Sequence, residues 1–342
     1  MASIRYPNPL APGNTIGVTA SSSPVHPDLR LRLEHCASVV RKLGFGMREG
    51  HCLMGDGIVS ADAQSRASEF MAMMLDPAIH VVMPPWGGEL QMNTLPLIDF
   101  DALARAPAKW FAGWSDGTTY NLPLLTLTGT ATLHGMNFMD AAFAPATGAA
   151  WWRDVLALHA GQSFTQHAIG KHQRGFKNYK THPTIEAYDL TEPAPWKVLG
   201  AERAVSVRGR LIGGCLEIVG KLIGTAYGDV TRFAHDYAPE GLLIYLENCE
   251  TNAPEACRML HQFKLAGWFE QANGVLLGRT GAADAHNFTQ DEVIADALGS
   301  LDIPVIYNMD IGHVPPQLLL VNGALAEVRY ANAGGSVVQT LV

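Results

Sequence analysis

Residues 110–117 read Trp110-Phe111-Ala112-Gly113-Trp114-Ser115-Asp116-Gly117, and they continue into Thr118-Thr119-Tyr120-Asn121-Leu122-Pro123-Leu124-Leu125. An apolar run that ends in a serine flanked by glycines predicts a strand, a sharp turn and then a helix. Such a turn lifts the serine hydroxyl above the edge of the sheet, beside the backbone N–H groups at the start of the helix. The pattern makes Ser115 a candidate nucleophile, although many turns of this composition are only turns.

Short apolar runs alternate with stretches of helical spacing on both sides of this turn. Expected strands cover residues 15–20, 79–83, 241–246, 274–278 and 304–308. Expected helices cover residues 28–43, 60–75 with Ser60 as N-cap, 210–227, 253–266 and 290–298. The tail, residues 318–342, alternates apolar and polar residues as β-hairpins do. Strands that alternate with helices predict an α/β fold with a parallel sheet and helices on its faces.

Residues 145–200 break this alternation and are rich in Trp, His, Lys, Pro and Gly. A loop of this length within a compact chain is either functional or disordered. We therefore expect an N-terminal α/β domain at 1–150 that carries Ser115. A linker and substrate loop at 151–200 and a C-terminal domain at 201–342 are expected to follow.

The composition favours a globular protein over several other classes. The chain has 342 residues, of which 48% are hydrophobic and 16% charged, so it can bury a sizeable core. Its net charge of -8 argues against a partner that is a nucleic acid polymer. No apolar run approaches the ~18 residues of a membrane span, and no signal peptide is visible. We expect a cytoplasmic protein that is not membrane-bound.

The cysteines and glycines give no sign of a metal or cofactor. The five cysteines are odd in number and lack C-x-x-C spacing, which fits reduced thiols better than disulfides or a zinc site. The chain has no H-E-x-x-H, no Walker loop and no G-x-G-x-x-G. We therefore expect no metal ligands and no cofactor.

Three chemically complementary residues follow apolar runs that we interpret as strands: Ser115, Glu247 and His313. Because ligands bind at the carboxyl ends of strands in open α/β sheets, these side chains are candidates for one site. A nucleophilic serine needs a base, and the base needs an orienting carboxylate. The N–H groups of Gly88 and Asp116 are candidates for an oxyanion hole. Taken singly, Glu247 could be a solvated carboxylate, His313 a structural histidine and Gly88 part of a tight turn.

Three stretches resemble the signature blocks of the LD-carboxypeptidase family of serine peptidases, namely Lys109–Asp116, Leu246–Glu250 and Asn308–His313. Similar stretches are Gly13–Ala20, Trp86–Gly88, Leu133–Gly135 and Gly278–Arg279, so the resemblance spans nearly the whole chain. It implies that Ser115 is the nucleophile, Glu247 the orienting acid and His313 the base. It also implies a flavodoxin-like parallel N-terminal domain, a smaller C-terminal α/β domain and a homodimer without metal or cofactor. Met136 and the stretch 317–323 depart from the family pattern. The resemblance therefore does not assign the residues of the substrate pocket.

Within that family, the long 145–200 segment resembles the microcin C self-immunity branch more than the compact murein enzymes. The resemblance implies that Trp196 stacks on a nucleotide base, although loop tryptophans often pin a loop to the core. Basic residues of the same segment could meet a phosphate or form a solvated face; they are Lys171, Arg174, Lys177 and Lys180. Further substrate-binding candidates are Trp86, Gly87 and Asn248.

The expected function is therefore that of a metal-free serine peptidase or amidase. Its substrate would be a small peptide or a peptidyl- or aminoacyl-nucleotide. The first alternative is a murein tetrapeptide L,D-carboxypeptidase. The second is an esterase of α/β-hydrolase type or a non-catalytic binding protein, and hydrolysis of esters but not amides would single out the esterase.

Overall fold

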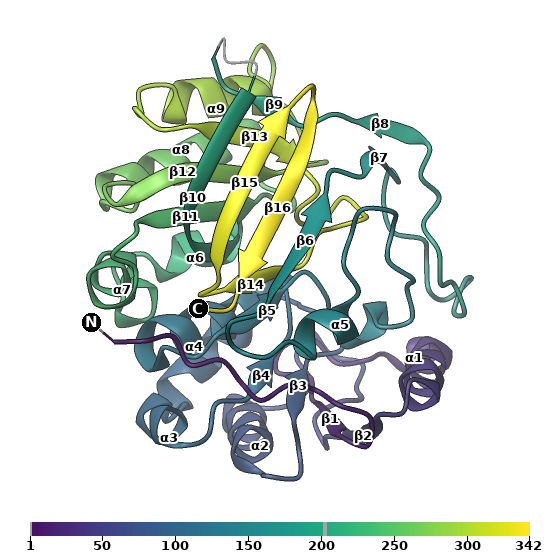
Figure 1. Cartoon of the computed structure of the whole chain (residues 1–342). Helices are drawn as coiled ribbons and strands as arrows, with labels where there is room; N and C mark the ends of the chain where they lie inside the picture. Colours follow the sequence, from purple (N-terminus) through teal and green to yellow (C-terminus); the bar gives the residue numbers. More distant parts are fainter. Residues whose placement is uncertain (1, 201–203) are drawn as a thin grey trace.

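The computed structural model describes residues 2–200 and 204–342, so the domain boundary expected at residue 201 lies outside the described residues. Figure 1 shows two main layers, a smaller sheet below and a larger sheet above. The smaller sheet is parallel throughout and has the strand order 2-1-3-4, as in flavodoxin-like folds. Its strands, in spatial order, are β2 (Gly46–Glu49), β1 (Thr15–Val18), β3 (Val81–Met83) and β4 (Trp110–Phe111).

Four helices belong to this part: α1 (Arg30–Lys42), α2 (Ala63–Leu75), α3 (Phe100–Arg105) and α4 (Thr118–Thr128). The N-cap of α2 is Asp62 and not Ser60, because the Asp62 carboxylate accepts a hydrogen bond from the N–H of Ser65. The Ser60 hydroxyl donates to the carbonyl of Ala20 and so ties the chain before α2 to β1. All but one residue of α4 are buried, so this helix forms part of the core of the molecule.

The larger sheet has the order β6-β16-β15-β10-β11-β12-β13-β9. Its central strands are parallel: β10 (Ala204–Cys215), β11 (Leu242–Glu247), β12 (Ala272–Gly278) and β13 (Val305–Met309). Antiparallel strands complete it: β15 (Leu325–Ala331), β16 (Gly334–Thr340), β6 (Ser163–His167) and β9 (Lys197–Val198). The β15–β16 pair is the hairpin that the tail predicts.

The remaining helices are α5 (Trp152–Leu156), α6 (Leu216–Leu222), α7 (Val230–Tyr237), α8 (Ala253–Leu265) and α9 (Gln290–Leu298). The helix expected at 210–227 is wrong over its first part, because residues 210–215 are the end of β10. This end of β10 pairs with β11 and is buried on both faces, so the alternation that marks a strand is hidden. Within the described ranges, every helix is too short or too polar to cross a membrane.

Residues 151–200 are more ordered than a linker and loop. They contain α5 and the edge strands β6 and β9, and also a small antiparallel pair, β7 (Gly170–His172) with β8 (Glu192–Ala194). Between β7 and β8 the chain is anchored to the N-terminal part: the Arg32 guanidinium donates to the carbonyls of Pro183 and Ile185. This anchoring holds the segment over the end of the smaller sheet.

The two layers are joined by a strand pair and by a common core. Strand β5 (Thr132–His134) pairs antiparallel with β14 (Leu320–Asn322), which comes from the far end of the chain and lies between the layers in Figure 1. One cluster of buried side chains includes Phe70 of α2, Tyr120 of α4, Val219 of α6 and Phe263 of α8. The carboxyl ends of β4, β11 and β13 therefore meet across a packed interface.

Candidate active site

Ser115 lies in the sharp turn that the sequence predicts. It follows β4 and opens a short 3-10 turn that runs into α4. Its φ angle is 60°, in the left-handed region that a residue with a side chain rarely adopts. Such strain costs on the order of 1–3 kcal/mol and persists only where the surroundings enforce it. Here the Asn121 side chain donates to the carbonyl of Gly113, which pins the turn from inside α4.

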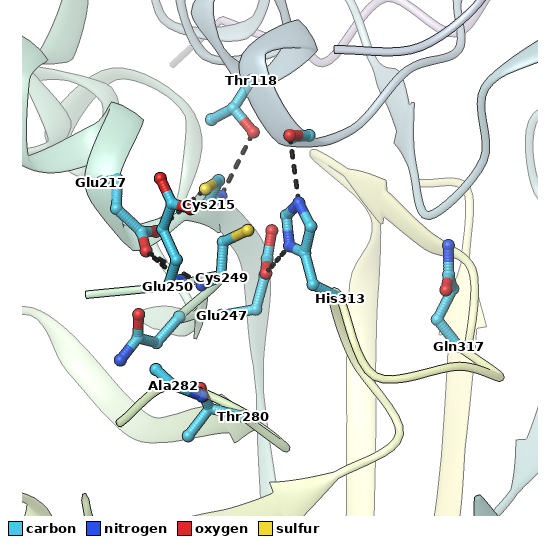
Figure 2. A network of polar contacts seen from close by, with 12 residues as sticks. Thr118, Cys215, Glu217, Glu247, Cys249, Glu250, Thr280, Ala282, His313 and Gln317 are labelled. Atoms are coloured by element: carbon cyan, nitrogen blue, oxygen red, sulfur yellow. Dashed lines mark hydrogen bonds and ion pairs between the residues drawn. The ribbon is translucent and has the colours of Figure 1, made fainter. Parts of the chain in front are cut away.

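The structure brings the three predicted site residues together. Nε2 of His313 lies 3.0 Å from Oγ of Ser115, and Nδ1 of His313 lies 2.6 Å from Oε2 of Glu247. Figure 2 shows the His313 ring next to the Glu247 carboxylate. Glu247 ends β11 and His313 follows β13, so the two come from the larger sheet while Ser115 comes from the smaller one. With the Nδ1–H donated to Glu247, Nε2 can accept the hydroxyl proton of Ser115.

Glu247 is only 1% exposed, and close backbone packing encloses it. A Cβ at Gly312, where φ is 92°, would lie only 2.5 Å from the Cβ of Glu247. Glycine at this position therefore lets the loop that carries His313 approach the carboxylate. A buried carboxylate without a partner is strongly unfavourable, and the imidazole of His313 supplies that partner.

The pair shifts both pKa values. Burial is the largest single influence on the pKa of His313 and lowers it, but the Glu247 carboxylate and the Cys249 side chain together raise it more, so the net direction is upward from 6.5. Burial raises the pKa of Glu247, and the charge of His313 opposes that rise. The two groups are coupled and titrate as a unit.

This coupling predicts the pH dependence of any reaction that uses His313 as a base. The imidazole must be neutral at Nε2, and a raised pKa means that it becomes neutral only at higher pH. We expect kcat/KM to rise with pH along a limb whose midpoint lies above 6.5, the ordinary value for histidine. Rates measured from about pH 5 to pH 10 would check this. A midpoint below 6.5 would contradict the coupling.

The loop that follows β3 forms the wall in front of Ser115. A Cβ at Gly87 would lie 2.7 Å from Oγ of Ser115 and 2.8 Å from the backbone N of Asp116, so only glycine leaves this space open. Within residues 2–200 and 204–342, the N–H groups of Gly88 and Asp116 have no acceptor in the protein. Two free N–H donors beside a nucleophile can stabilise an oxyanion.

The Asp116 side chain holds that loop in place. Its carboxylate is 2% exposed and accepts hydrogen bonds from the Ser22 hydroxyl at 2.5 Å, the Gln91 N–H at 2.9 Å and the Thr119 hydroxyl at 3.1 Å. Burial raises its pKa, and these hydrogen bonds act against that rise. The serine-rich turn after β1 thus connects the oxyanion loop to the start of α4.

A cleft of about 210 Å³ opens beside Ser115 and His313. Four aromatic residues line it: Trp86, Trp114, Phe176 and Tyr179. Phe176 is 37% exposed and its ring centroid lies 5.9 Å from that of Trp114. The Tyr179 hydroxyl donates to Asp140, which anchors the segment that carries Phe176. We call this space the aromatic cleft.

The predicted substrate-binding residues fall in different places. Trp86 and Gly87 line the aromatic cleft. Asn248 lines a separate pocket at the ends of β11 and β12. Trp196 is 1% exposed, and its indole N–H donates to Asp310 at 2.8 Å. The stacking role expected for Trp196 does not fit this position, because a ring buried in the core offers no face to a ligand.

The sequence gives no sign of one further residue, Glu217 at the start of α6. Its Oε1 accepts hydrogen bonds from the successive N–H groups of Cys249, Glu250 and Thr251, at 2.9 to 3.1 Å. Figure 2 shows this carboxylate among the side chains around Glu247. These bonds fix the turn that follows Glu247. The expected helix at 210–227 hides the residue, because it makes Glu217 one of many polar residues inside a helix.

Comparisons with known proteins show which family and which fold this chain shares. Family models described as the LD-carboxypeptidase N-terminal and C-terminal domains match residues 16–135 and 208–328. The microcin C7 self-immunity protein of Escherichia coli is 25% identical, over 97% of this chain and 95% of its own. A Bacillus subtilis protein named "Probable murein peptide carboxypeptidase" is 25% identical, over 96% and 93%. A solved structure of the microcin C7 self-immunity protein with aspartyl sulfamoyl adenosine has a TM-score of 0.81 at 22% identity, covering 98% of this chain and 99% of its own.

Proposed function

The chain belongs to the LD-carboxypeptidase family and is a serine peptidase, and we propose that Ser115, Glu247 and His313 are its catalytic triad. The observation that carries the proposal is the continuous relay from the Ser115 hydroxyl through His313 to Glu247, with distances of 3.0 and 2.6 Å. The order of roles is that of a nucleophile, a base and an orienting acid.

The proposed triad can carry each step of amide hydrolysis. His313 Nε2 takes the proton of Ser115 as Oγ attacks the carbonyl carbon, and the carbonyl oxygen becomes an oxyanion held by the N–H groups of Gly88 and Asp116. The imidazolium, held by Glu247, then protonates the leaving nitrogen as the C–N bond breaks. Water, deprotonated by His313, attacks the acyl-enzyme and releases the acid and the free hydroxyl.

For the substrate, we propose an aminoacyl- or peptidyl-nucleotide whose base enters the aromatic cleft. Phe176 is the residue that we assign to stacking on the base, because its ring is partly exposed beside Trp114 and lines the aromatic cleft. Stacking on an aromatic ring contributes about 1–3 kcal/mol per base. The likeness to the microcin C7 self-immunity protein along nearly the whole chain supports this choice.

Murein tetrapeptide is the second candidate. The Bacillus subtilis relative is as similar in identity and coverage as the microcin C7 self-immunity protein, so similarity alone does not separate the two. We also propose that the chain forms a homodimer, as the family resemblance implies, and sedimentation velocity would check this.

A small substrate panel tests the assignment. We expect aminoacyl sulfamoyl adenosine to be hydrolysed with a higher kcat/KM than murein tetrapeptide or simple dipeptides, with products identified by mass spectrometry. Phe176→Ala should lower kcat/KM for the adenosine substrate by about tenfold or more, because the stacking energy is lost. Phe176→Trp should restore it, and dipeptide hydrolysis serves as the internal control. Faster release of D-alanine from the tetrapeptide, with no effect of Phe176→Ala, would favour the murein enzyme.

A further inference from the structure

A group of metal-ligand side chains lies on the outer surface of the larger layer, on helices α8 and α9. Cys257 and His261 are four residues apart on α8, so both side chains lie on one face of that helix. Asp296 comes from α9, which packs beside α8. The sulfur, imidazole and carboxylate atoms all lie within 4.8 Å of one another. Among the described residues, this is the only group of three or more such ligands.

The hydrogen bonds in this group point to chelation rather than to nucleophilic catalysis. Oδ1 of Asp296 lies 3.3 Å from Sγ of Cys257 and 2.9 Å from Nε2 of His261. The carboxylate thus stands between the thiol and the imidazole, and the imidazole does not face the thiol as a base would. In a tetrahedral zinc site with bonds of 2.0–2.3 Å, neighbouring ligand atoms are about 3.4 Å apart. The two separations from Oδ1 of Asp296 come close to that value, the Cys257 and His261 ligand atoms lie within 4.8 Å of each other, and half-exposed side chains can adjust by small rotations.

The surroundings also suit a cation with one open position. A surface hollow lined by Cys257, Arg258, His261, Leu265 and Phe288 borders the group and leaves room for water as a fourth ligand. The nearby Arg258 guanidinium is paired with Glu255 at 2.8 Å, which offsets its charge. A divalent ion bound by one thiolate and one carboxylate would leave the site without net charge.

We propose that Cys257, His261 and Asp296 form a binding site for one Zn²⁺ ion that links α8 to α9. Thiolate and imidazole ligands select zinc and similar transition metals over magnesium and calcium. None of the three residues lines the aromatic cleft, so the site is separate from the proposed triad. The sequence predicts no metal site because the third ligand lies 35 residues beyond His261, on another helix.

Zinc titration of the full, untagged chain with reduced thiols tests the proposal. We expect one Zn²⁺ per chain by calorimetry, with an affinity in the micromolar range, and a rise in Tm on adding zinc. Cys257→Ser, His261→Ala and Asp296→Asn should each weaken binding about tenfold or more and remove the Tm shift. Cobalt in place of zinc should give a thiolate-to-metal absorption band that is absent from Cys257→Ser.

His235→Ala is the matched control. His235 and Asp236 on α7 form a surface pair at the same 2.9 Å distance, but they are not part of a group of three ligands. This variant should bind zinc as the original chain does. The proposal is overturned if the original chain binds no zinc, or if Cys257→Ser and Asp296→Asn bind it as tightly as the control.

Discussion

Replacing Ser115 with alanine is expected to lower kcat for amide hydrolysis by about 10⁵- to 10⁶-fold, the size of effect known for loss of a catalytic serine. The hydroxyl is the only group in the relay that can form the acyl-enzyme. Folding should be preserved, because among the described residues the Ser115 hydroxyl forms a hydrogen bond only with His313. Alanine also tolerates the backbone about as well as serine does, since the φ of 60° is enforced by the turn around it.

The measurement is single-turnover hydrolysis of the best substrate from the panel, with Tm recorded for each variant. Ser163→Ala provides a matched control: Ser163 lies on the exposed edge strand β6, and its hydroxyl pairs with Thr340 at 2.8 Å. That variant should keep full activity. If Ser115→Ala hydrolysed the substrate at a normal rate, the chemistry would have to use another residue.

Glu247→Gln should lower kcat by about 10⁴-fold, since an amide can neither hold the imidazole in the required tautomer nor balance the imidazolium charge. The same change should move the acidic limb of the pH profile to lower pH. The sign follows from the pair: the Glu247 carboxylate is the largest influence that raises the pKa of His313, and its removal leaves burial, which lowers that pKa, opposed mainly by Cys249. The position of the acidic limb therefore distinguishes a changed His313 pKa from a general loss of structure.

Glu327→Gln is the control for this experiment, because Glu327 forms an exposed pair with Arg329 on β15, away from the cleft. Its rates and pH profile should match those of the original chain. A Glu247→Gln enzyme with lowered kcat and an unmoved acidic limb would mean that Glu247 acts on folding and not on His313.

The sequence predicts those strands and turns whose local pattern of apolar and polar residues matches the burial of the side chains in the fold. The parallel strands, the turn at Ser115 and the tail hairpin are all local patterns. Because strand ends gather in parallel sheets, the sequence also places Ser115, Glu247 and His313 as candidates for one site, and their side chains lie within hydrogen-bonding distance.

Other parts depend on tertiary partners that the sequence does not name. The last residues of strand β10, 209–215, are all buried, so the alternation of a strand is lost there, and β9 has only two residues. Trp196 lies in a polar, proline-rich stretch typical of a surface loop. In the folded chain it is nevertheless buried, and its indole N–H donates to the buried Asp310 carboxylate. The roles of Glu217 and Phe176 depend on contacts that form only in the folded chain. Glu217 accepts a hydrogen bond from the N–H of Cys249, and Phe176 packs beside Trp114.

The antiparallel pairing of β14 with β5 has a consequence for how this enzyme meets its substrate. The segment that carries His313 is attached at one end to β13 of the larger sheet. At its other end, β14 attaches it to β5, the strand beside the turn that carries Ser115. The Gln317 amide adds a bond to the carbonyl of Gly135. The relay is therefore assembled during folding, and substrate binding need not close a hinge to complete it. The chemical centre is thus held from both layers, and any adaptation to different substrates falls to the aromatic cleft that Phe176 lines.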